Sequence, residues 1–301
     1  MNLLKPLKKA VFPVAGLGSR FLPATKANPK EMLPIVDKPL IQYAVEEAYR
    51  AGLHDLIFVT SSSKRAIEDH FDSHYELERK LLEQGKSALY QCVKDITPPG
   101  VRFSYVRQPE ALGLGHAILC ARHIIGDEAF AVLLADDLIE ESSTSCLGAM
   151  VDAYRASGNS QIAVQRVLPS EVPHYGIVDV STFQGAWADI RRIIEKPDLK
   201  DAPSDLAAVG RYVFTPDIFN CLESVEADQR GEIQLTDAIA QLILTDRVQA
   251  FLFSGHRYDC GSKIGYVKAT VAYALKHPEL REALRAYLKE VAGKIEIAEM
   301  A

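Results

Sequence analysis

The hydrophobic positions in the first half of the chain follow two different periods in turn. Short apolar runs, typical of buried strands, are separated by stretches in which apolar residues recur every three to four positions, as on one face of a helix. A helical stretch of this kind begins at Pro39 and ends near Gly52. We predict strands at residues 9–15, 56–60, 103–106, 129–135, 161–167, 177–180, 190–194 and 209–214. This alternation predicts an α/β sheet.

The pattern changes in the second half of the chain. Between about residues 169 and 205, short strands follow one another closely with Pro and Gly turns between them, which predicts an antiparallel or inserted region. From residue 263 onward the pattern is mainly helical, and Pro278 separates a first helix from a second at residues 280–291. We therefore expect a helical tail after the sheet.

Composition and charge exclude several classes of protein. Hydrophobic residues make up 48% and charged residues 25% of the 301 positions, as in ordinary globular proteins. The net charge of -6 argues against nucleic acid or an anionic membrane as a partner, because both require a surplus of Lys and Arg. The five cysteines form no C-x-x-C pair, and we see neither a membrane-spanning apolar run nor a signal peptide. We predict a cytoplasmic protein.

A glycine loop follows the first predicted strand. Its order of Gly16, Gly18 and Phe21 departs from G-x-G-x-x-G at the third glycine, and it also lacks the G-K-[ST] ending of a Walker A loop. The backbone N–H groups of the loop can approach phosphate oxygens, and Arg20 supplies a guanidinium for the same anion. An ordinary turn between strand and helix is the alternative interpretation.

The connector after this loop carries more candidate chemistry. Residues 25–34 contain Lys26, Lys30 and Glu31 among prolines that discourage both helix and strand. Long ordered loops of this kind are usually functional. A nucleoside triphosphate carries several negative charges. If it were the bound anion, Arg20 and Lys30 could neutralise the charge that builds up on pyrophosphate as it leaves.

At this point the sequence resembles a known family. Residues 15–43, AGLGSRFLPATKANPKEMLPIVDKPLIQY, are similar to the signature of the sugar-1-phosphate nucleotidylyltransferases. The resemblance continues in the family's order through QPEALGLGHA, LLADD, HYGIV, EKP, VGRYVF, GEIQLTDAI and YDCGSKIGY, and so covers essentially the whole chain.

The resemblance implies a fold and an organisation. The fold is a Rossmann-like, three-layer α/β fold of the nucleotide-diphospho-sugar transferase type, with a mixed, mainly parallel sheet, a small antiparallel sugar-side region and the helical tail. We expect one nucleotidyltransferase domain over residues 1–301, with a nucleotide-binding half at about 8–168, a sugar-binding part at about 169–262 and C-terminal helices at about 263–301. The resemblance also implies a homo-oligomer, either a dimer or a tetramer, in which the helical tail is a candidate contact between subunits.

Two aspartates are candidate metal ligands. The apolar strand at 129–135 ends in Asp136 and Asp137, where an open α/β sheet presents its ligand crevice. The resemblance assigns Mg²⁺ to Asp136 together with Asp259, and hard carboxylate oxygens suit this ion. For Asp137, contact with the nucleotide and a solvated strand end or helix cap remain equal alternatives.

Other residues are candidates for nucleotide recognition. Gln108 offers one donor and one acceptor, which complement the edge of uracil. The resemblance places uracil against Ala15 and Gly16, puts Gln108 and Gly113 at its edge, and brings Glu31 near the nucleoside. Without the resemblance, Gln108 is more often a surface amide and Gly113 a turn residue, and we interpret His116 as structural. We also assign Gly18 and Lys26 to the nucleotide.

The sugar side has its own set of residues. Gly176 could allow close approach of a hydroxylated ring, and Glu195 can accept hydrogen bonds from two hydroxyls. The resemblance implies that Glu195 and Gly210 contact glucose and that Lys196 contacts its phosphate. Without the resemblance, Glu195 and Lys196 would more often be a solvated pair at a strand edge. Thr236 and Asp237 look like a helix cap.

The implied reaction transfers UMP from UTP to glucose 1-phosphate in an in-line, Mg²⁺-dependent displacement that releases pyrophosphate. Arg20, Lys30 and Lys196 would be the catalytic cations. Three alternatives remain: an enzyme that uses dTTP or CTP with the same sugar phosphate, a catalytically silent nucleotide-sugar sensor or regulatory subunit, and a Rossmann oxidoreductase.

Overall fold

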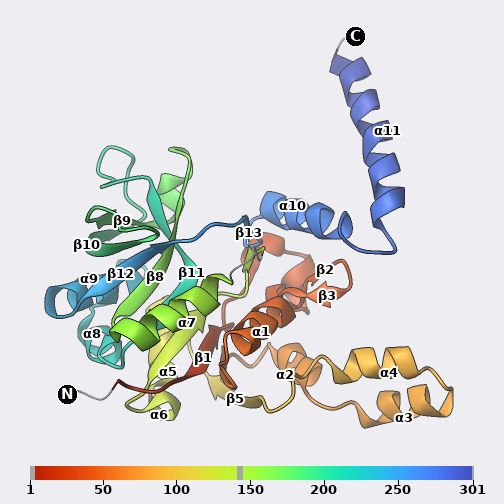
Figure 1. The fold of residues 1–301 in the computed structure, drawn as a ribbon, viewed down its shortest axis with the longest axis horizontal. Helices are drawn as coiled ribbons and strands as arrows, with labels where there is room; N and C mark the ends of the chain where they lie inside the picture. The colour runs from red at the N-terminus through yellow and green to blue at the C-terminus, as the bar shows by residue number, and fades with distance from the viewer. Residues whose placement is uncertain (1–3, 141–144, 300–301) are drawn as a thin grey trace.

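A nine-stranded sheet forms the centre of the computed structural model, which describes residues 4–140 and 145–299 (Figure 1). The order across the described sheet is β5-β4-β1-β6-β11-β8-β12-β10-β9. Its pairings make β11 and β10 run opposite to the other strands, so the sheet is mixed and mainly parallel, as expected. The strands are β1 (Leu7–Pro13), β4 (Asp55–Thr60), β5 (Arg102–Arg107), β6 (Ala129–Leu133), β8 (Ser160–Arg166), β9 (Gly176–Val180), β10 (Trp187–Glu195), β11 (Leu206–Phe214) and β12 (Val248–Leu252).

All eight predicted strands are present, with ends displaced by up to three residues. The first strand begins at Leu7 and ends at Pro13, so residues 14 and 15 already belong to the loop that follows it. The prediction missed β12 and two small two-stranded sheets. These pair β2 (Pro34–Ile35) with β3 (Lys38–Pro39), and β7 (Asp137–Ile139) with β13 (Arg257–Asp259). Strands of two or three residues are too short to show an alternating pattern.

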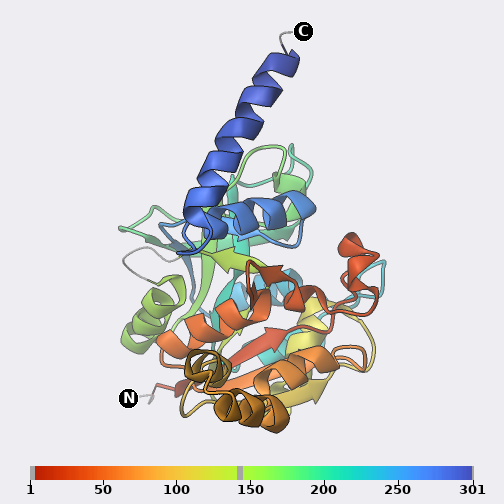
Figure 2. The same cartoon turned by 90° about the vertical axis from the view of Figure 1, so that its right-hand side faces the viewer.

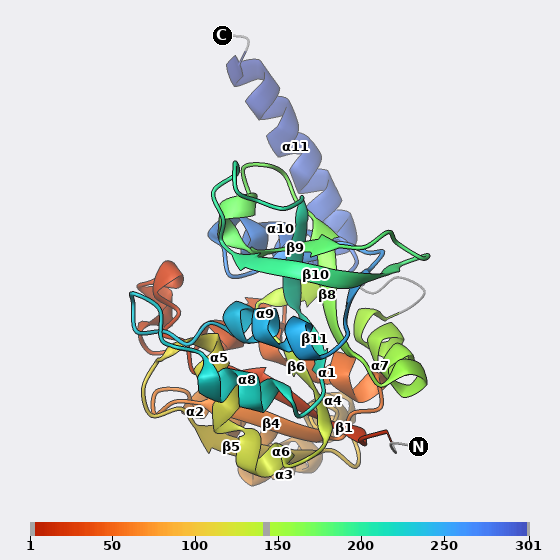
Figure 3. The same cartoon turned by 90° about the vertical axis from the view of Figure 1, so that its left-hand side faces the viewer.

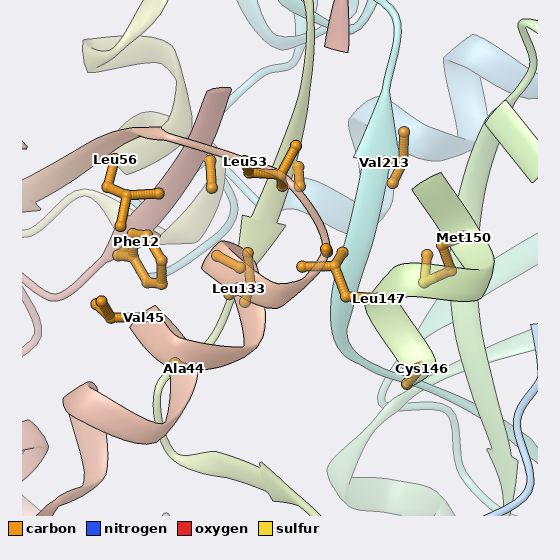
Figure 4. Packing of buried hydrophobic residues seen from close by; sticks show 14 of the residues in the cluster. Phe12, Ala44, Val45, Leu53, Leu56, Leu133, Cys146, Leu147, Met150 and Val213 are labelled. Atoms are coloured by element: carbon orange, nitrogen blue, oxygen red, sulfur yellow. The ribbon is translucent and has the colours of Figure 1, made fainter. Parts of the chain in front are cut away.

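Helices cover both faces of the sheet and make the three layers that were predicted. Phe12 and Leu133 point into the face covered by α1 and α7, where they join Val45 and Leu147 (Figure 4). Val11, the neighbour of Phe12, points to the other face, which α5, α8 and α9 cover (Figure 3). The helices are α1 (Leu40–Arg50), α2 (Arg65–Phe71), α3 (Tyr75–Glu83), α4 (Ser87–Lys94), α5 (Gly113–Cys120), α6 (Arg122–Ile125), α7 (Cys146–Ser157), α8 (Ile218–Ser224), α9 (Leu235–Thr245), α10 (Lys263–Ala274) and α11 (Arg281–Glu299).

The second half of the chain has the predicted antiparallel region and helical tail. Strand β10 is antiparallel to β9 and β12, and β9 also meets β11 where Ile177 pairs with Ala207. In the tail, α10 packs on the body, whereas α11 projects away from it (Figures 1 and 2). Within residues 4–140 and 145–299, the structure has no helix of the length and apolar character needed to cross a membrane.

The sheet topology brings the candidate loops to one edge. Strands β1 and β6 are parallel neighbours, so the glycine loop after β1 and the aspartates after β6 leave the sheet at the same edge. The β7–β13 pair then sets Asp259 opposite Asp137, although the two residues are 122 positions apart in the chain. This edge is where open α/β sheets bind their ligands.

Candidate active site

Asp136 and Lys30 form an ion pair at this edge of the sheet. The Lys30 Nζ lies 2.6 Å from the Asp136 Oδ2, and each side chain is 24% exposed. Burial works against the ionised Asp136 carboxyl, but the charge and hydrogen bond of Lys30 outweigh it and hold the pKa of Asp136 below its usual value. Burial likewise opposes the charge of Lys30, yet Asp136 keeps the pKa of this ammonium raised. Both groups are therefore charged at neutral pH.

Gly261 marks the point where Asp136, Asp259 and Arg20 converge. A Cβ added to this glycine would lie 2.9 Å from the Asp259 Oδ1, 3.0 Å from the Asp136 Oδ2 and 3.3 Å from the Arg20 Nη1. The Arg20 Nη1 donates to the carbonyl oxygen of Gly261 at 3.0 Å, and the Gly261 N–H donates to the Asp259 Oδ1 at 2.9 Å. Two carboxylate oxygens therefore border one small cradle, which suits a hard divalent cation.

Asp137 lies behind this cradle and is bonded to the protein through both carboxylate oxygens. Its Oδ2 accepts the Gly210 N–H at 2.7 Å, and its Oδ1 accepts the Arg257 Nε at 2.6 Å. Burial is the largest influence on Asp137 and raises the pKa of its carboxyl. The structure thus favours a structural role over nucleotide contact, although that role is an internal ion pair, which we did not foresee. Gly210 has no room for a side chain, because its Cβ would lie 2.5 Å from the Asp137 Oδ2.

The glycine loop and the lysine connector fold back on each other through short 3-10 turns at Ser19–Phe21, Ala24–Lys26 and Lys30–Met32. Gly18 has a φ of 66°, and its Cβ would lie 3.3 Å from the Cβ of Lys30, so a glycine is required there. Around the Gly16 position there is open space, and Lys26 is exposed. Ala15 is buried at the start of the loop.

Glu31 is turned inward beneath this connector. Its Oε2 lies 2.9 Å from the Lys64 Nζ, and both side chains are less than 5% exposed. Burial raises the pKa of Glu31, although Lys30 and Lys64 counteract it. The Glu31 Oε1 is buried without a hydrogen-bond partner in the described part of the chain. Glu31 therefore supports the Lys30 connector from inside, and any contact with a nucleoside would have to come through its unpaired oxygen.

Gln108 and Gly113 form a second corner of the site. The Gln108 Nε2 donates to the carbonyl oxygen of Gly113 at 3.1 Å and lies 3.0 Å from the His116 Nδ1. Gln108 is buried, contrary to the surface amide of our alternative interpretation. Gly113 has a φ of 91°, and a Cβ there would lie 2.9 Å from the carbonyl oxygen of Ile233. The amide is therefore held in one orientation by the turn and by His116.

The sugar-side residues also meet one another. Glu195 pairs with Gly176 across β10 and β9, and a Cβ at Gly176 would lie 3.3 Å from both the Glu195 Oε2 and the Thr236 Oγ1. Thr236 Oγ1 donates to the Glu195 Oε2 at 2.6 Å, while the Lys196 Nζ lies 2.6 Å from the Glu195 Oε1. Our prediction of a cap at Thr236 and Asp237 is wrong, because α9 begins at Leu235 with Gln234 at its N-cap. Thr236 lies in the first turn and points at Glu195.

Tyr175 connects the sugar side to the aspartates. Its hydroxyl donates to the Asp259 Oδ2 at 3.3 Å, its ring lies 4.9 Å from the Arg257 guanidinium, and it directly precedes Gly176. Sequence reasoning did not assign a role to Tyr175, Arg257, Lys64 or Arg211. The clue for Tyr175, Arg257 and Arg211 was their position inside or beside quoted motifs, whereas nothing in the sequence marks Lys64.

Comparisons with known proteins identify the family of the chain. The nucleotidyl transferase family model matches residues 9–276. A UTP–glucose-1-phosphate uridylyltransferase of Staphylococcus epidermidis is 51% identical over 288 residues, which are 96% of this chain and 99% of that protein. A UTP-bound UGPase from Acinetobacter baumannii has a TM-score of 0.89 at 45% identity over 95% of this chain and 99% of that one. A UDP-glucose pyrophosphorylase complexed with UDP-glucose has a TM-score of 0.82 at 45% identity over 90% of this chain and all of that one. The chain therefore belongs to the nucleotidyl transferase family.

Proposed function

We propose that the protein transfers UMP from UTP to α-D-glucose 1-phosphate and releases pyrophosphate. The observation that carries this proposal is the convergence of Asp136, Asp259 and Arg20 around Gly261, with Lys30 paired to Asp136. Relatives at about half identity over nearly the full chain are named uridylyltransferases of this kind, and similar structures hold UTP or UDP-glucose. Cations at this point can offset the charge of two anionic phosphates, and the carboxylates can hold a divalent cation that does the same.

The reaction needs no protein nucleophile. A phosphate oxygen of the sugar phosphate is already anionic and attacks the α-phosphorus of UTP, while the bond from that phosphorus to the bridging oxygen of the β-phosphate breaks. Pyrophosphate leaves with the electron pair. Arg20 and Lys30 would stabilise the charge on this leaving group, and Lys196 would hold the sugar phosphate in line.

Mg²⁺ is the cation that we assign to Asp136 and Asp259. The fit rests on the cradle at Gly261, where two carboxylate oxygens face a space that a single Cβ would fill. Mg²⁺ is commonly held by one or two carboxylates together with substrate phosphates, and when bound it would neutralise phosphate charge. Lys30 lies on the same Asp136 oxygen, so it would have to share that oxygen or turn toward a phosphate when the cation binds.

For nucleotide recognition, the proposal uses Ala15, Gly16 and Gln108, with Gly18, Lys26, Glu31 and Gly113 around them. Gln108 is buried and bonded at its Nε2, which leaves its oxygen to accept the N–H edge of a pyrimidine. Glu195, Gly176 and Gly210 form the sugar side. A cytoplasmic location and a homo-oligomeric state, dimer or tetramer, stay predictions.

The deciding experiment incubates the protein with UTP, glucose 1-phosphate and Mg²⁺ and identifies the nucleotide product by its mass. UDP-glucose and stoichiometric pyrophosphate are expected. Parallel reactions with dTTP and CTP test the thymidylyl and cytidylyl alternatives, since faster turnover with either would displace UTP as the substrate. Binding without turnover would favour a regulatory protein, and NAD(H) binding would favour an oxidoreductase.

Two variants connect the reaction to the cradle. Asp136→Asn and Asp259→Asn remove one negative charge each with little change of shape, so each is expected to lose nearly all turnover while its circular dichroism stays that of the parent. Wild-type rates in either variant at limiting Mg²⁺ would reject the metal assignment.

A further inference from the structure

Arg211 is a fully buried arginine directly beneath the aspartate turn. It is 1% exposed and comes from β11, next to Gly210. Its Nε and Nη2 donate to the Glu47 Oε2 of helix α1 at 3.0 and 2.7 Å. The other partner groups of Arg211 are the backbone carbonyl oxygens of Leu134, Asp137 and Gly210, so within the described chain its guanidinium bonds only to Glu47 and to main-chain atoms.

Two of these carbonyls lie on either side of Asp136. The Arg211 Nη1 donates to the carbonyl oxygen of Leu134 at 3.0 Å, and its Nη2 donates to that of Asp137 at 2.8 Å. The planar guanidinium therefore joins the two ends of the turn that carries Asp136 and ties them to α1. A lysine would supply a single nitrogen in place of this rigid fork.

A buried ion pair is an expensive way to fill this space. Removing two charges from water costs several kcal/mol per ion, and apolar side chains of similar volume are often at least as stabilising. The cost is visible here in the Glu47 Oε1, which is buried without a hydrogen-bond partner among the described residues. Stability alone is therefore a weak explanation for a charged pair at this position.

A second arginine fastens the opposite side of the cradle. Arg257 lies two residues before Asp259 on β13 and donates to the Asp137 Oδ1 at 2.6 Å. The other oxygen of Asp137 holds the Gly210 N–H, next to Arg211. Asp137 thus links the strand that carries Asp259 to the turn that Arg211 braces.

We propose that Glu47 and Arg211 are positioning residues that preset the Asp136 carboxylate for the divalent cation before substrates bind. This inference rests on the proposed function, because the cation is part of it. Outer-shell partners of metal ligands typically change metal affinity by about 10- to 100-fold when they are removed. A pair that served stability alone would change the unfolding temperature and leave metal affinity as it is.

The test compares the affinity for Mn²⁺·UTP with the affinity for metal-free UTP in EDTA, measured by calorimetry without sugar phosphate so that no turnover occurs. The dissociation constant for metal-free UTP divided by that for Mn²⁺·UTP isolates the contribution of the metal to binding. Glu47→Gln retains an oxygen for Arg211 but loses the charge, and Arg211→Lys retains the charge but loses the fork. In both variants we expect this ratio to fall about tenfold, with metal-free UTP binding unchanged.

Tyr154→Phe is the matched control. Tyr154 is equally buried in α7, and its hydroxyl donates to the carbonyl oxygen of Lys5, far from the cradle in sequence. This variant is expected to lose stability with no change in the ratio. Raising Mg²⁺ should restore much of the rate of Glu47→Gln and Arg211→Lys, which a general loss of stability would not allow.

The outcomes separate the two proposals. If the wild-type protein shows no metal-dependent UTP binding and makes no UDP-glucose, the proposed function itself fails. If the wild type does both and the two variants bind Mn²⁺·UTP like the wild type, only the positioning role is overturned. Failure of both variants to fold would also overturn it, because the pair would then be a structural requirement.

Discussion

At the scale of single residues, Gly261 shows how little space the cradle leaves. Its backbone φ lies outside the left-handed range, so alanine is allowed by conformation and excluded only by its neighbours. The nearest of these are oxygens of Asp259 and Asp136, at 2.9 and 3.0 Å from the added Cβ. The requirement for glycine is therefore a requirement of the site and not of the fold.

We predict that Gly261→Ala lowers kcat/KM by about 100-fold, since displacing catalytic groups by about 1 Å can cost that much. The unfolding temperature should change less than the activity does, because the conflict lies with two carboxylate side chains and not with the backbone. Gly148→Ala is the control. Its Cβ would meet Ser145 at an ordinary 3.4 Å within helix α7, so activity should be unaffected. If Gly261→Ala loses activity and stability together, the fold and not the site requires the glycine.

Cys260 gives a second prediction at this scale, because it lies between Asp259 and Gly261 but faces the interior. Burial, together with the charges of Asp137, Asp136 and Asp259, raises the pKa of its thiol to about 12. At pH 8 roughly one molecule in 10,000 would then carry the reactive thiolate. Iodoacetamide should label the exposed Cys92 in the native protein and leave Cys260 unmodified until denaturant is added. Peptide mass spectrometry measures the labelling of each cysteine. Labelling of Cys92 and Cys260 at equal rates in the native protein would contradict this prediction.

At the scale of elements, the first turn of α9 and the end of β10 build the sugar side together. Thr236→Val keeps the shape of the side chain but removes the donor that holds the Glu195 Oε2 at 2.6 Å. Hydrogen bonds to charged groups contribute about 1.5–3 kcal/mol, so we expect the KM for glucose 1-phosphate to rise roughly 10-fold or more. The KM for UTP should stay the same.

Thr270→Val provides the matched control for this measurement. Its hydroxyl donates to the carbonyl oxygen of Tyr266 at 2.9 Å, within α10. Both KM values of this variant should equal those of the wild type. If Thr236→Val raises the KM for UTP as much as the KM for glucose 1-phosphate, Thr236 has no role specific to the sugar.

The same elements mark what the sequence can and cannot predict. Apolar runs predicted all eight strands that they were used for, most clearly β4 and β6, where burial on both faces leaves a continuous hydrophobic signal. They carry no information about strand direction, so the reversed β11 had to come from the structure. The pairing of Thr236 with Glu195 depends on how α9 packs against β10, and a local pattern cannot encode that contact.

Site residues follow the same division. Arg20, Lys30 and Asp136 could be named as candidates because glycines, prolines or a strand end set their loops apart in the sequence. Arg211 and Lys64 were missed because each is a charged residue in the interior, and such residues are rare enough to be read as surface positions. Their partners, Glu47 and Glu31, lie far away in the sequence, so only folding brings the charges together.

At the scale of the whole molecule, α10 packs against the body, whereas α11 projects away from it (Figure 1). Helix α10 is fastened to the body, where Tyr266 donates to the carbonyl oxygen of Pro34 and Tyr273 packs edge-on against Tyr43. The family match ends at residue 276, before α11 begins. Leu284, Leu288 and Val291 recur at helical spacing along α11 and are partly exposed. Such a stripe on a projecting helix suits contact with another copy of the chain.

We therefore predict that a chain ending at Leu280 keeps the catalytic body but forms a smaller assembly. Isolated helices contribute little stability of their own, so the shortened chain should still fold. Light scattering of the full and shortened chains measures the assembly directly. In the full-length chain, Leu284→Gln with Leu288→Gln should have the same effect, whereas Lys289→Gln on the exposed side of α11 should have none. If the shortened chain assembles with the same number of subunits as the full-length chain, the contact lies elsewhere on the body, and the apolar stripe of α11 has another partner.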